Sequence, residues 1–511
     1  MGLEALFQRA AREHWKKTAV VCNRTRISYG CLEERSTQVA GMLRNMLDPG
    51  EKKVLLLAHN SILCLEALLG CLKAGVTACP VNWRLSPYEL STLLIQERFG
   101  LIFYDRDTWG LLQQSLDLCD FQIPRMRLGG LKYQSCVQFF AYDRPVIDEK
   151  RGIDEIAIQY FTSGSTGVPK GVLHTHRSMI QYLRAYSTAS GWPENGVYQT
   201  SANLFHLSGF SALISLCLGN KLVLMDHFQM EEFLQAMKEE KVTRVSVVPT
   251  LLTKMLEDGR LSSFRTERLV YAGSAMAPSQ IQRALEHLPC TLEMAYGSTE
   301  TCCISMLTET DHRAVAEGRL DRRKLASVGR PLPEVSVRLE DSQGGEPLLG
   351  GIGEILVKSP FLYQGYSGSH VQQSLTQDGY HRTGDIGRWD EDGYLYIVDR
   401  KHDMIVCGGE NIYPREVEIC IAKMINCVQA VGVVGEPDPV WGERVAAFVV
   451  PKAGTHPSAE DIIAFCKHNI ASYKKPSRVI FVDALPLDGN GKVSKRALRE
   501  LLNEGISDPS Q

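Results

Sequence analysis

The sequence predicts an α/β protein with a large N-terminal domain of stacked, mainly parallel sheets, a β-rich subdomain and a small α+β C-terminal domain. Three observations lead to this prediction. A chain of 511 residues is too long for one hydrophobic core. Between residues 50 and 300, short apolar runs alternate with segments of helical length, which is typical of parallel sheets covered on both faces. Beyond residue 325 the pattern changes to β-hairpins.

The first part of the chain supplies the parallel sheets. Residues 1–17 have the spacing of an amphipathic helix, and KVLLLA (53–58) is expected to be a strand that precedes a helix over 62–74. Further strands are expected at 101–105, 221–226, 244–249, 268–273 and 291–296, with helices at 230–241 and 278–288. Ligands of such sheets bind beyond the carboxyl ends of the strands, where the loops after 161, 273 and 296 are rich in Gly, Ser and Thr.

The second part supplies the hairpins and the small domain. Hairpin strands are expected at 336–345, 353–359 and 387–400, the last with a turn at Asp392-Gly393. We place the domain boundary at 399–402, which gives a large domain, 1–399, and a small domain, 400–511. Within the small domain, strands are expected at 430–435, 443–450 and 478–486, with a helix at 458–469.

Composition and charge exclude several classes of protein. A net charge of −3 gives no reason to expect a nucleic acid partner. The longest apolar stretch, 54–75, is broken by His, Asn, Glu and Lys, so we expect no transmembrane segment. Fifteen cysteines without a CxxC pair favour reduced thiols, and with no secretory signal or peroxisomal ending we expect a cytoplasmic protein. The sequence leaves a homodimer open.

The stretch FTSGSTGVPKG (161–171) is the most informative loop. Its glycines let the backbone approach a ligand closely, its hydroxyls donate hydrogen bonds, and Lys170 is a mobile positive charge, so it predicts a phosphate site. The loop follows an apolar strand-like run, 156–161, and we expect a helix after it. It is not a Walker A motif, because its lysine follows a proline and precedes no Ser or Thr.

Four later segments, in order, complete a resemblance to a known family: YGSTE (296–300), YHRTGDIG (380–387), DRKHDMIVCGGENIYPREVE (399–418) and GNGKV (489–493). With the loop, they resemble the adenylate-forming (AMP-binding) superfamily, in its acyl-CoA ligase branch of fatty acyl-, aryl- and succinylbenzoate-CoA ligases. The resemblance implies an AMP-forming acid–thiol ligase. A carboxylate attacks the α-phosphate of ATP and releases pyrophosphate, and the thiol of coenzyme A then displaces AMP from the acyl-adenylate.

The resemblance also assigns roles to residues of the nucleotide site. The β- and γ-phosphates are expected on Thr162, Ser163, Gly164, Ser165, Thr166, Gly167 and Lys170. Adenine is expected beside Gly273, Ser274, Ala275, Tyr296 and Gly297. Thr299 is expected on the α-phosphate and Glu300 on Mg²⁺, since a hard cation prefers carboxylate oxygen. Asp385 is expected to bind the ribose hydroxyls and Arg400 the ribose or phosphate.

The resemblance further implies that the small domain is mobile and carries a catalytic lysine. Lys492 is expected to bridge the substrate carboxylate and the α-phosphate, stabilising the charge that develops there. The domain is expected to rotate about the hinge at 399–402, where His402 departs from the Asp or Lys that the family usually has. Rotation would bring the loop 408–410 to the pantetheine channel, and His206 matches a family aromatic that gates this channel.

Two other histidines, His174 and His176, follow the phosphate loop. Their spacing suggests a metal site, but no third ligand lies nearby in the sequence, so we expect a structural or surface role.

The acyl pocket is expected to be apolar. Its walls are predicted from the segments 205–210, 272–276 and 294–304, which contain no Lys or Arg. We therefore expect a fatty acid of medium or long chain, with an aromatic acid of the benzoate, cinnamate or succinylbenzoate type as the alternative. A stand-alone adenylating enzyme that loads a carrier protein is a further alternative, although no carrier-domain motif follows residue 500.

Different classes of protein remain to be separated by experiment. An ATP phosphotransferase or ATPase would also bind ATP but would form ADP. A non-catalytic acyl-binding relative is disfavoured because Lys170, Glu300, Asp385 and Lys492 are all present. Nothing in the motifs excludes or recommends a luciferase-like oxygenase.

Overall fold

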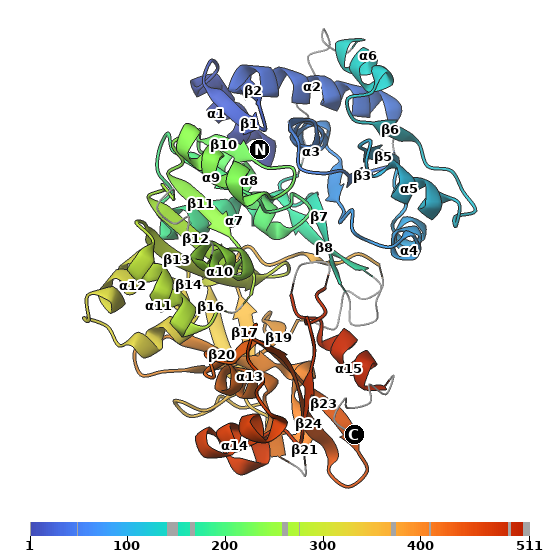
Figure 1. Ribbon diagram of the computed structural model, residues 1–511. Coiled ribbons are helices and arrows are strands. Elements are labelled where there is room, and N and C mark those ends of the chain that lie inside the picture. Colours follow the sequence, from blue (N-terminus) through green and yellow to red (C-terminus); the bar gives the residue numbers. More distant parts are fainter. Residues whose placement is uncertain are drawn as a thin grey trace. The chain divides into compact units, whose positions relative to one another are not determined.

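The computed structural model describes residues 2–48, 50–139, 152–163, 169–257, 264–274, 276–368, 375–407, 410–488 and 492–503 (Figure 1). The chain divides into two compact units, the first formed by Met1–Ser336 and Val357–His381 and the second by Val337–Leu356 and Arg382–Gln511. The hinge at 399–402 and the domains drawn from it remain predictions.

A mixed sheet of nine strands forms one half of the first unit. Its order is β15 (Arg330–Pro331), β14 (Cys302–Leu307), β13 (Thr291–Ser298), β12 (Arg268–Ala272), β11 (Arg244–Val247), β9 (Val197–Thr200), β10 (Lys221–Leu224), β1 (Thr18–Cys22) and β2 (Thr25–Ser28). In this order, every neighbouring pair between β13 and β1 is parallel. The strands β2, β14 and β15 are paired antiparallel at the two edges. The five predicted strands that fall in this sheet or the next, from 101–105 to 291–296, are confirmed.

A second sheet of the first unit has seven strands. Its order is β18 (Gly365–Tyr366), β8 (Pro169–Thr175), β7 (Ile156–Ser163), β4 (Thr77–Pro80), β3 (Lys53–Leu57), β5 (Leu101–Tyr104) and β6 (Arg125–Arg127). The strands β4, β3, β5 and β6 are parallel, and β7 and β8 form an antiparallel pair. The segment directly after the phosphate loop is therefore a strand, and the expected helix, α7 (His176–Ala189), begins only after it.

Helices cover both sheets of the first unit. They are α1 (Leu3–Glu13), α2 (Tyr29–Met46), α3 (Ile62–Ala74), α4 (Pro87–Glu97), α5 (Trp109–Leu116), α6 (Leu131–Phe139), α8 (Phe210–Cys217), α9 (Met230–Glu239), α10 (Pro249–Glu257), α11 (Pro278–His287) and α12 (Glu309–Ala316). The helix predicted at 62–74 is confirmed, and its ends have a clear cause. Ser61 accepts the amide N–H of Cys64 at the start, and Gly75 adopts φ +88° at the end.

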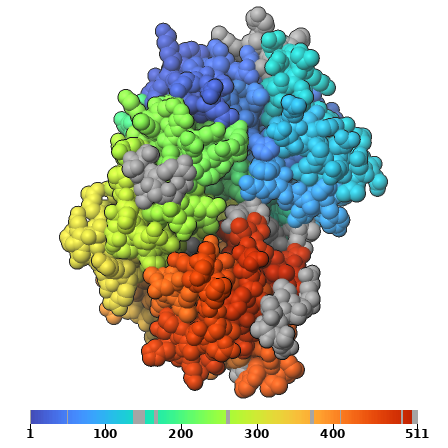
Figure 2. All heavy atoms as spheres, in the orientation of Figure 1, coloured from blue at the N-terminus to red at the C-terminus, as the bar shows by residue number. Residues whose placement is uncertain are grey.

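One large core joins these elements. It contains buried apolar side chains from α1, α2, α3, α7 and α8 together with side chains from β1, β3 and β7. In Figure 1, α1, α2 and α3 (blue) lie beside β1, β2 and β3. In the space-filling view, blue and green atoms from early and middle parts of this unit form a continuous surface (Figure 2).

The second unit contains the predicted hairpins and the α+β segment. One sheet has the order β16 (Ser336–Glu340), β17 (Gly353–Lys358), β19 (His381–Trp389) and β20 (Leu395–Arg400). The first residue of β16, the last two of β17 and the first of β19 are counted in the first unit. The turn predicted at Asp392-Gly393 is confirmed, since Gly393 adopts φ +74° between β19 and β20.

A second sheet of this unit supports the C-terminal helices. Its order is β22 (Glu410–Ile412), β21 (Ile405–Cys407), β24 (Gly442–Pro451) and β23 (Val428–Asp438), and β25 (Arg478–Phe481) pairs with β24. The helices are α13 (Pro414–Ala422), α14 (Ala459–Asn469) and α15 (Lys495–Asn503). The strands and the helix predicted between 430 and 486 are confirmed, and β23, β24, α13 and α14 contribute to one core.

Two expectations from composition can be compared with this structure. No helix of the described ranges is long and apolar enough to cross a membrane. All cysteines whose side chains the structure describes are free thiols, as expected.

Candidate active site

The phosphate loop is flanked by two paired strands. In the register of β7 and β8, Thr162 lies opposite Lys170 and Ser163 lies opposite Pro169. The pairing brings the two ends of the loop together, so Thr162 and Lys170 meet where the loop begins and ends. The predicted site residues Gly164, Ser165, Thr166 and Gly167, and also Ala275, lie outside the described residues, as does the side chain of Ser163.

Lys170 and Glu300 both contact one tyrosine. The ammonium of Lys170 lies over the ring of Tyr366, 5.7 Å from its centroid, and the Tyr366 hydroxyl donates a 3.0 Å hydrogen bond to Glu300 Oε1. Within the described ranges, neither Lys170 nor Glu300 forms an ion pair with another side chain. The structure thus brings two predicted site residues together through a residue that the sequence did not single out.

The turn that carries Thr299 and Glu300 is fixed by its backbone. Ser298 and Thr301 exchange hydrogen bonds between their amides and hydroxyls, and the Nε2 of buried His174 lies 2.8 Å from the Thr299 carbonyl oxygen. Because a carbonyl oxygen only accepts, His174 donates from Nε2 and must be the neutral tautomer protonated there. Burial lowers the pKa of His174 to about 4, which keeps it neutral.

The predicted adenine residues come from neighbouring parallel strands. Ala272 at the end of β12 pairs with Ala295 of β13, so Gly273 follows β12 beside Tyr296. Gly273 adopts φ +93°, with open space where a side chain would project. Gly297 is required for a different reason, since a Cβ there would lie 1.7 Å from the carbonyl oxygen of Cys302. Tyr296 is half-buried, and Ser274 is accessible beside it.

His206 lies in a separate loop of the same unit. It precedes a short 3₁₀ turn, Leu207–Gly209, and its ring packs against that of Phe205 with centroids 4.4 Å apart. Its predicted role at the thiol channel stays a prediction.

The remaining predicted residues gather in the second unit. Arg400 Nε lies 2.6 Å from the Asp385 carboxylate, because the two residues are direct partners in the register of β19 and β20. The side chain of Lys492 is exposed, yet surrounding atoms desolvate its ammonium and Arg400 repels it, so its pKa lies below the ordinary value. Asp385, Arg400 and Lys492 therefore form one charged group.

The residue at the predicted pivot is also described. His402 lies in a 3₁₀ turn, Lys401–Asp403, and its side chain is exposed, with Nε2 3.8 Å from Asp403. Lys401 instead pairs with Glu354 at 2.8 Å. The salt bridge from this turn to strand β17 is therefore formed by Lys401, the residue before His402.

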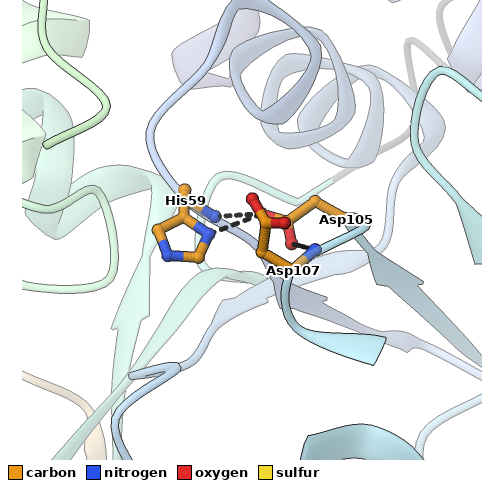
Figure 3. Close-up of side chains that lie close together, drawn as sticks. All are labelled: His59, Asp105 and Asp107. Carbon is orange, nitrogen blue, oxygen red and sulfur yellow. Dashed lines mark hydrogen bonds and ion pairs between the residues drawn. The ribbon is translucent and has the colours of Figure 1, made fainter. Parts of the chain in front are cut away.

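A further cluster, His59, Asp105 and Asp107, has the residue types of a metal site (Figure 3). One Asp105 oxygen accepts the amide and the Nδ1–H of His59 at 2.7 and 2.8 Å, and the other accepts the amides of Asp107 and Thr108. These hydrogen bonds involve both oxygens of the Asp105 carboxylate and the Nδ1 atom of His59. His59 and Asp105 therefore form a pair that closes the loop after β5, and the hydrogen bonds to Asp105 explain this contact without a metal ion.

The pKa values of this pair follow from the same contacts. Burial opposes ionisation of Asp105, but the hydrogen bonds from His59 and the backbone lower its pKa to about 2. The hydrogen bond to Asp105 raises the pKa of His59 above its ordinary value. His59 also packs against Trp83, with ring centroids 4.3 Å apart.

Sequence reasoning missed Tyr366 and undervalued His174. Tyr366 reaches Glu300 through the pairing of β18 with β8, a register that no local pattern in the sequence reveals. His174 is a buried hydrogen-bond donor to the Thr299 carbonyl, so the expectation of a structural role is confirmed and the metal alternative has no support among the described residues.

Comparison with known proteins identifies the family. The sequence matches the AMP-binding enzyme family over residues 7–367 and the C-terminal domain of AMP-binding enzymes over residues 416–492. The chain belongs to the AMP-binding, adenylate-forming enzyme family. More particularly, it is an enzyme of the AMP-forming acyl-CoA ligase type, as the resemblance of its motifs predicted.

Individual relatives agree over almost the full chain. It is 32% identical to a fatty acid–[acyl-carrier-protein] ligase, ScoC, of Streptomyces coeruleorubidus, over 94% of this chain and 93% of the relative. It is 32% identical to a feruloyl-CoA synthase of an Amycolatopsis species, over 98% of both chains. The structure of an o-succinylbenzoate-CoA synthetase of Bacillus subtilis with its acyl-adenylate intermediate is similar, with a TM-score of 0.83, 26% identity and 98% of both chains covered.

Proposed function

We infer that this protein activates a fatty acid with ATP and transfers the acyl group to coenzyme A, giving acyl-CoA, AMP and pyrophosphate. The observation that supports this proposal most is the contact of both Lys170 and Glu300 with Tyr366, beside the ends of the phosphate loop. A cation and a carboxylate that form no ion pair with each other, at the ends of a phosphate loop, suit a triphosphate and its counter-ion.

Lys170 and the loop hydroxyls are proposed to bind the β- and γ-phosphates. In the first half-reaction a carboxylate oxygen of the acid forms a bond to the α-phosphorus, and the bond from that phosphorus to the bridging oxygen breaks. The electron pair leaves with pyrophosphate, and a nearby ammonium such as Lys170 stabilises the charge of this leaving group. Thr162, opposite Lys170 in the strand register, is proposed to donate to the same phosphates.

Glu300 meets the requirements of a magnesium ligand. Its Oε1 accepts a single hydrogen bond, from Tyr366, and no cationic side chain of the described residues pairs with the carboxylate. Oxygen lone pairs therefore remain available to a hard cation. When bound, Mg²⁺ supplies positive charge against the phosphate oxygens. Thr299 is proposed to donate its hydroxyl to the α-phosphate, and the contact from His174 to its carbonyl fixes the backbone there.

The charged group of the second unit is proposed to act on the ribose and on the reacting atoms. Asp385 is proposed to accept hydrogen bonds from the ribose hydroxyls, with Arg400 beside it. Lys492 is proposed to bridge the substrate carboxylate and the α-phosphate. Because its ammonium is partly desolvated and faces Arg400, it gains more from binding an anion than an ordinary surface lysine would.

In the second half-reaction the thiolate sulfur attacks the acyl carbon and AMP leaves with the electron pair of the acyl–oxygen bond. His206 is proposed to lie at the entrance of the thiol, and the loop at 408–410, of which the structure describes Glu410, is proposed to approach after rotation of the small domain. Pyrophosphate must leave first, so a phosphate loop without a Walker motif suits a ligand that is released.

The preference for a fatty acid rests on the apolar walls of the acyl pocket. Of the side chains in the predicted wall segments, Leu207, Met276 and Met294 are partly exposed, whereas Phe210, Cys302, Cys303 and Ile304 are buried in the core. The partly exposed members are flexible and apolar, which suits an alkyl chain of variable shape. An aromatic acid is the alternative, as for the feruloyl-CoA synthase.

A panel of acids tests the proposal. Pyrophosphate release is measured with medium- and long-chain fatty acids, benzoate, cinnamate and succinylbenzoate, with coenzyme A, with a phosphopantetheinylated acyl carrier protein, and with neither. We expect the largest kcat/KM with a fatty acid and coenzyme A. A preference for an aromatic acid or for the carrier protein would overturn that part of the proposal, and acid-independent formation of ADP would overturn the ligase mechanism.

A further inference from the structure

Among the described residues, three contacts are made to Thr299 and Glu300, and one of them involves the Glu300 carboxylate. The amide of Tyr363 donates to the Glu300 carbonyl oxygen at 2.9 Å, and His174 donates to the carbonyl before it, at Thr299. Both contacts fix the backbone and leave the direction of the side chain open. The Tyr366 hydroxyl is the donor that reaches Oε1, at 3.0 Å.

The segment that carries Tyr366 is attached to the strand of the phosphate loop. β18 pairs with β8, with Tyr366 opposite Val172 and Gly365 opposite Leu173. The amides of Gln364 and Ser367 donate to the carbonyl oxygens of Leu173 and Gly171 at 2.7 and 2.8 Å. Gly171 needs to be glycine for this approach, because a Cβ would lie 2.4 Å from the Ser367 hydroxyl. The position of Tyr366 is therefore defined relative to Lys170, two residues before Val172.

Lys170 and Glu300 would attract each other if nothing lay between them. A direct ion pair would occupy the carboxylate oxygens that a cation needs and the ammonium that a phosphate needs. Instead, Lys170 lies over the negative face of the Tyr366 ring, and Glu300 accepts from the positive hydrogen of its hydroxyl. One side chain satisfies both groups without neutralising either.

We propose that Tyr366 is a positioning residue that keeps Lys170 and Glu300 apart and orients the Glu300 carboxylate toward the divalent cation of the nucleotide. This inference rests on the proposed role of Glu300. Hydrogen-bond partners of metal-binding carboxylates commonly change metal affinity or activity by 10- to 100-fold when they are removed. The hydroxyl of Tyr366 is in this position, and its ring supports Lys170.

Tyr366→Phe removes the hydroxyl and keeps the ring. We measure the affinity for α,β-methylene-ATP by titration calorimetry, once with saturating Mg²⁺ and once with EDTA. Wild-type protein is expected to bind more tightly with Mg²⁺, and in Tyr366→Phe this gain should shrink by about tenfold. The affinity in EDTA should stay unchanged, because the cation–ring contact of Lys170 remains. In Tyr366→Leu, which lacks the ring, the affinity in EDTA should fall as well.

Tyr133→Phe is the matched control. Tyr133 also donates its hydroxyl to a carboxylate, that of Glu66, at 3.3 Å, but Glu66 is already paired with Arg35. Loss of this hydroxyl should leave both nucleotide affinities unchanged. In a Glu300→Gln background, Tyr366→Phe should have no further effect on the Mg²⁺-dependent gain, because the carboxylate that it orients is absent.

The outcomes separate this inference from the function on which it rests. A wild-type protein whose nucleotide affinity does not respond to Mg²⁺ would contradict the proposed role of Glu300. A normal response in wild type that Tyr366→Phe retains in full would contradict the role of Tyr366 alone. A Tyr366→Phe protein that fails to fold would also contradict it, since the hydroxyl would then support the fold and not the orientation of the carboxylate. In pyrophosphate release, the Mg²⁺ concentration for half-maximal rate should rise about tenfold, with recovery of kcat at high Mg²⁺.

Discussion

Two groups of charged side chains in the first unit are built in opposite ways. At the carboxyl ends of β3 and β5, His59 and Asp105 face each other, and both oxygens of the Asp105 carboxylate accept hydrogen bonds (Figure 3). Beside β8, Lys170 and Glu300 both contact Tyr366 and form no ion pair with each other. The first arrangement satisfies its charges internally, whereas the second leaves them able to bind a ligand.

Because of this difference we interpret the first group as structural and propose the second as a binding site, although residue types alone would suggest the reverse. By composition, His59, Asp105 and Asp107 look more like a metal site than Glu300 with one tyrosine. A carboxylate that accepts four hydrogen bonds has little capacity left for a cation, however. Substitutions should therefore affect stability in the first group and catalysis in the second.

The largest effect is expected from Lys492→Ala in the second unit. Removal of a cation that stabilises the transition state typically lowers kcat by about 10²–10³. We expect at least this loss in acid-dependent pyrophosphate release, and little change in thioester formation from supplied acyl-adenylate. Equal loss in both half-reactions would contradict the assigned role.

Lys495→Ala is the control for that variant. Lys495 lies 3.8 Å from Asp399 and 3.5 Å from Glu418, so it is a lysine in ion pairs three residues after Lys492. Its replacement should lower stability and leave the ratio of the two half-reaction rates as in wild type.

A smaller effect is expected from Glu300→Gln in the first unit. The amide keeps the size of the side chain and removes the charge, so kcat/KM for ATP should fall by about 10- to 100-fold. The free energy of unfolding, measured with urea, should change by less than about 0.5 kcal/mol, because no ion pair of the described residues is lost. A large loss of stability with normal activity would mean that Glu300 is structural, which would contradict the comparison with Asp105.

Asp105→Asn should show the opposite pattern. The neutral amide loses the ion pair with His59, and we expect a decrease of about 2 kcal/mol in the free energy of unfolding, with kcat unchanged. The pKa of Asp105 is lowered to about 2 in the folded state, so its contribution is complete above the unfolded pKa of about 4. The difference from wild type should therefore disappear as the pH falls from about 4 to about 2. A difference that persists below pH 2 would show that the ion pair is not its cause.

The last effect appears only below neutral pH and comes from the buried His174. Its pKa is lowered to about 4, so between about pH 6.5 and 4 the unfolded chain binds a proton that the folded protein does not. Stability should fall with falling pH in this window, with a contribution from His174 of up to about 1.4 kcal/mol per pH unit. His174→Gln keeps an N–H for the Thr299 carbonyl and should reduce that slope. An unchanged dependence of stability on pH would mean that His174 does not cause it.

Much of the fold could be predicted because its signals are local. The runs 53–58, 244–249 and 268–273 are short and mainly apolar, and each contains a strand of the parallel sheets. The strand β8 was missed because Pro169, Lys170 and Gly171 do not form the pattern of a strand. Its extended structure depends on its pairing with β7.

The candidate site could be proposed from the sequence where motifs carry it. The motifs named Lys170, Glu300, Asp385, Arg400 and Lys492, and the register of β19 and β20 explains why Asp385 and Arg400 meet. Tyr366 could not be predicted, because its contact with Glu300 depends on β18 pairing with a strand almost two hundred residues earlier in the chain. The same holds for His174, whose partner is a backbone carbonyl.

The central claim is that the acid attacks the α-phosphate of ATP, and one isotope measurement tests it directly. The protein is incubated with ATP, coenzyme A and a fatty acid labelled with ¹⁸O in both carboxylate oxygens, and the products are analysed by mass spectrometry. We predict one ¹⁸O atom in the phosphate of AMP and none in pyrophosphate, because the oxygen that bonds to the α-phosphorus leaves with AMP. Label in inorganic phosphate together with ADP would show attack at the γ-phosphate and would contradict the account.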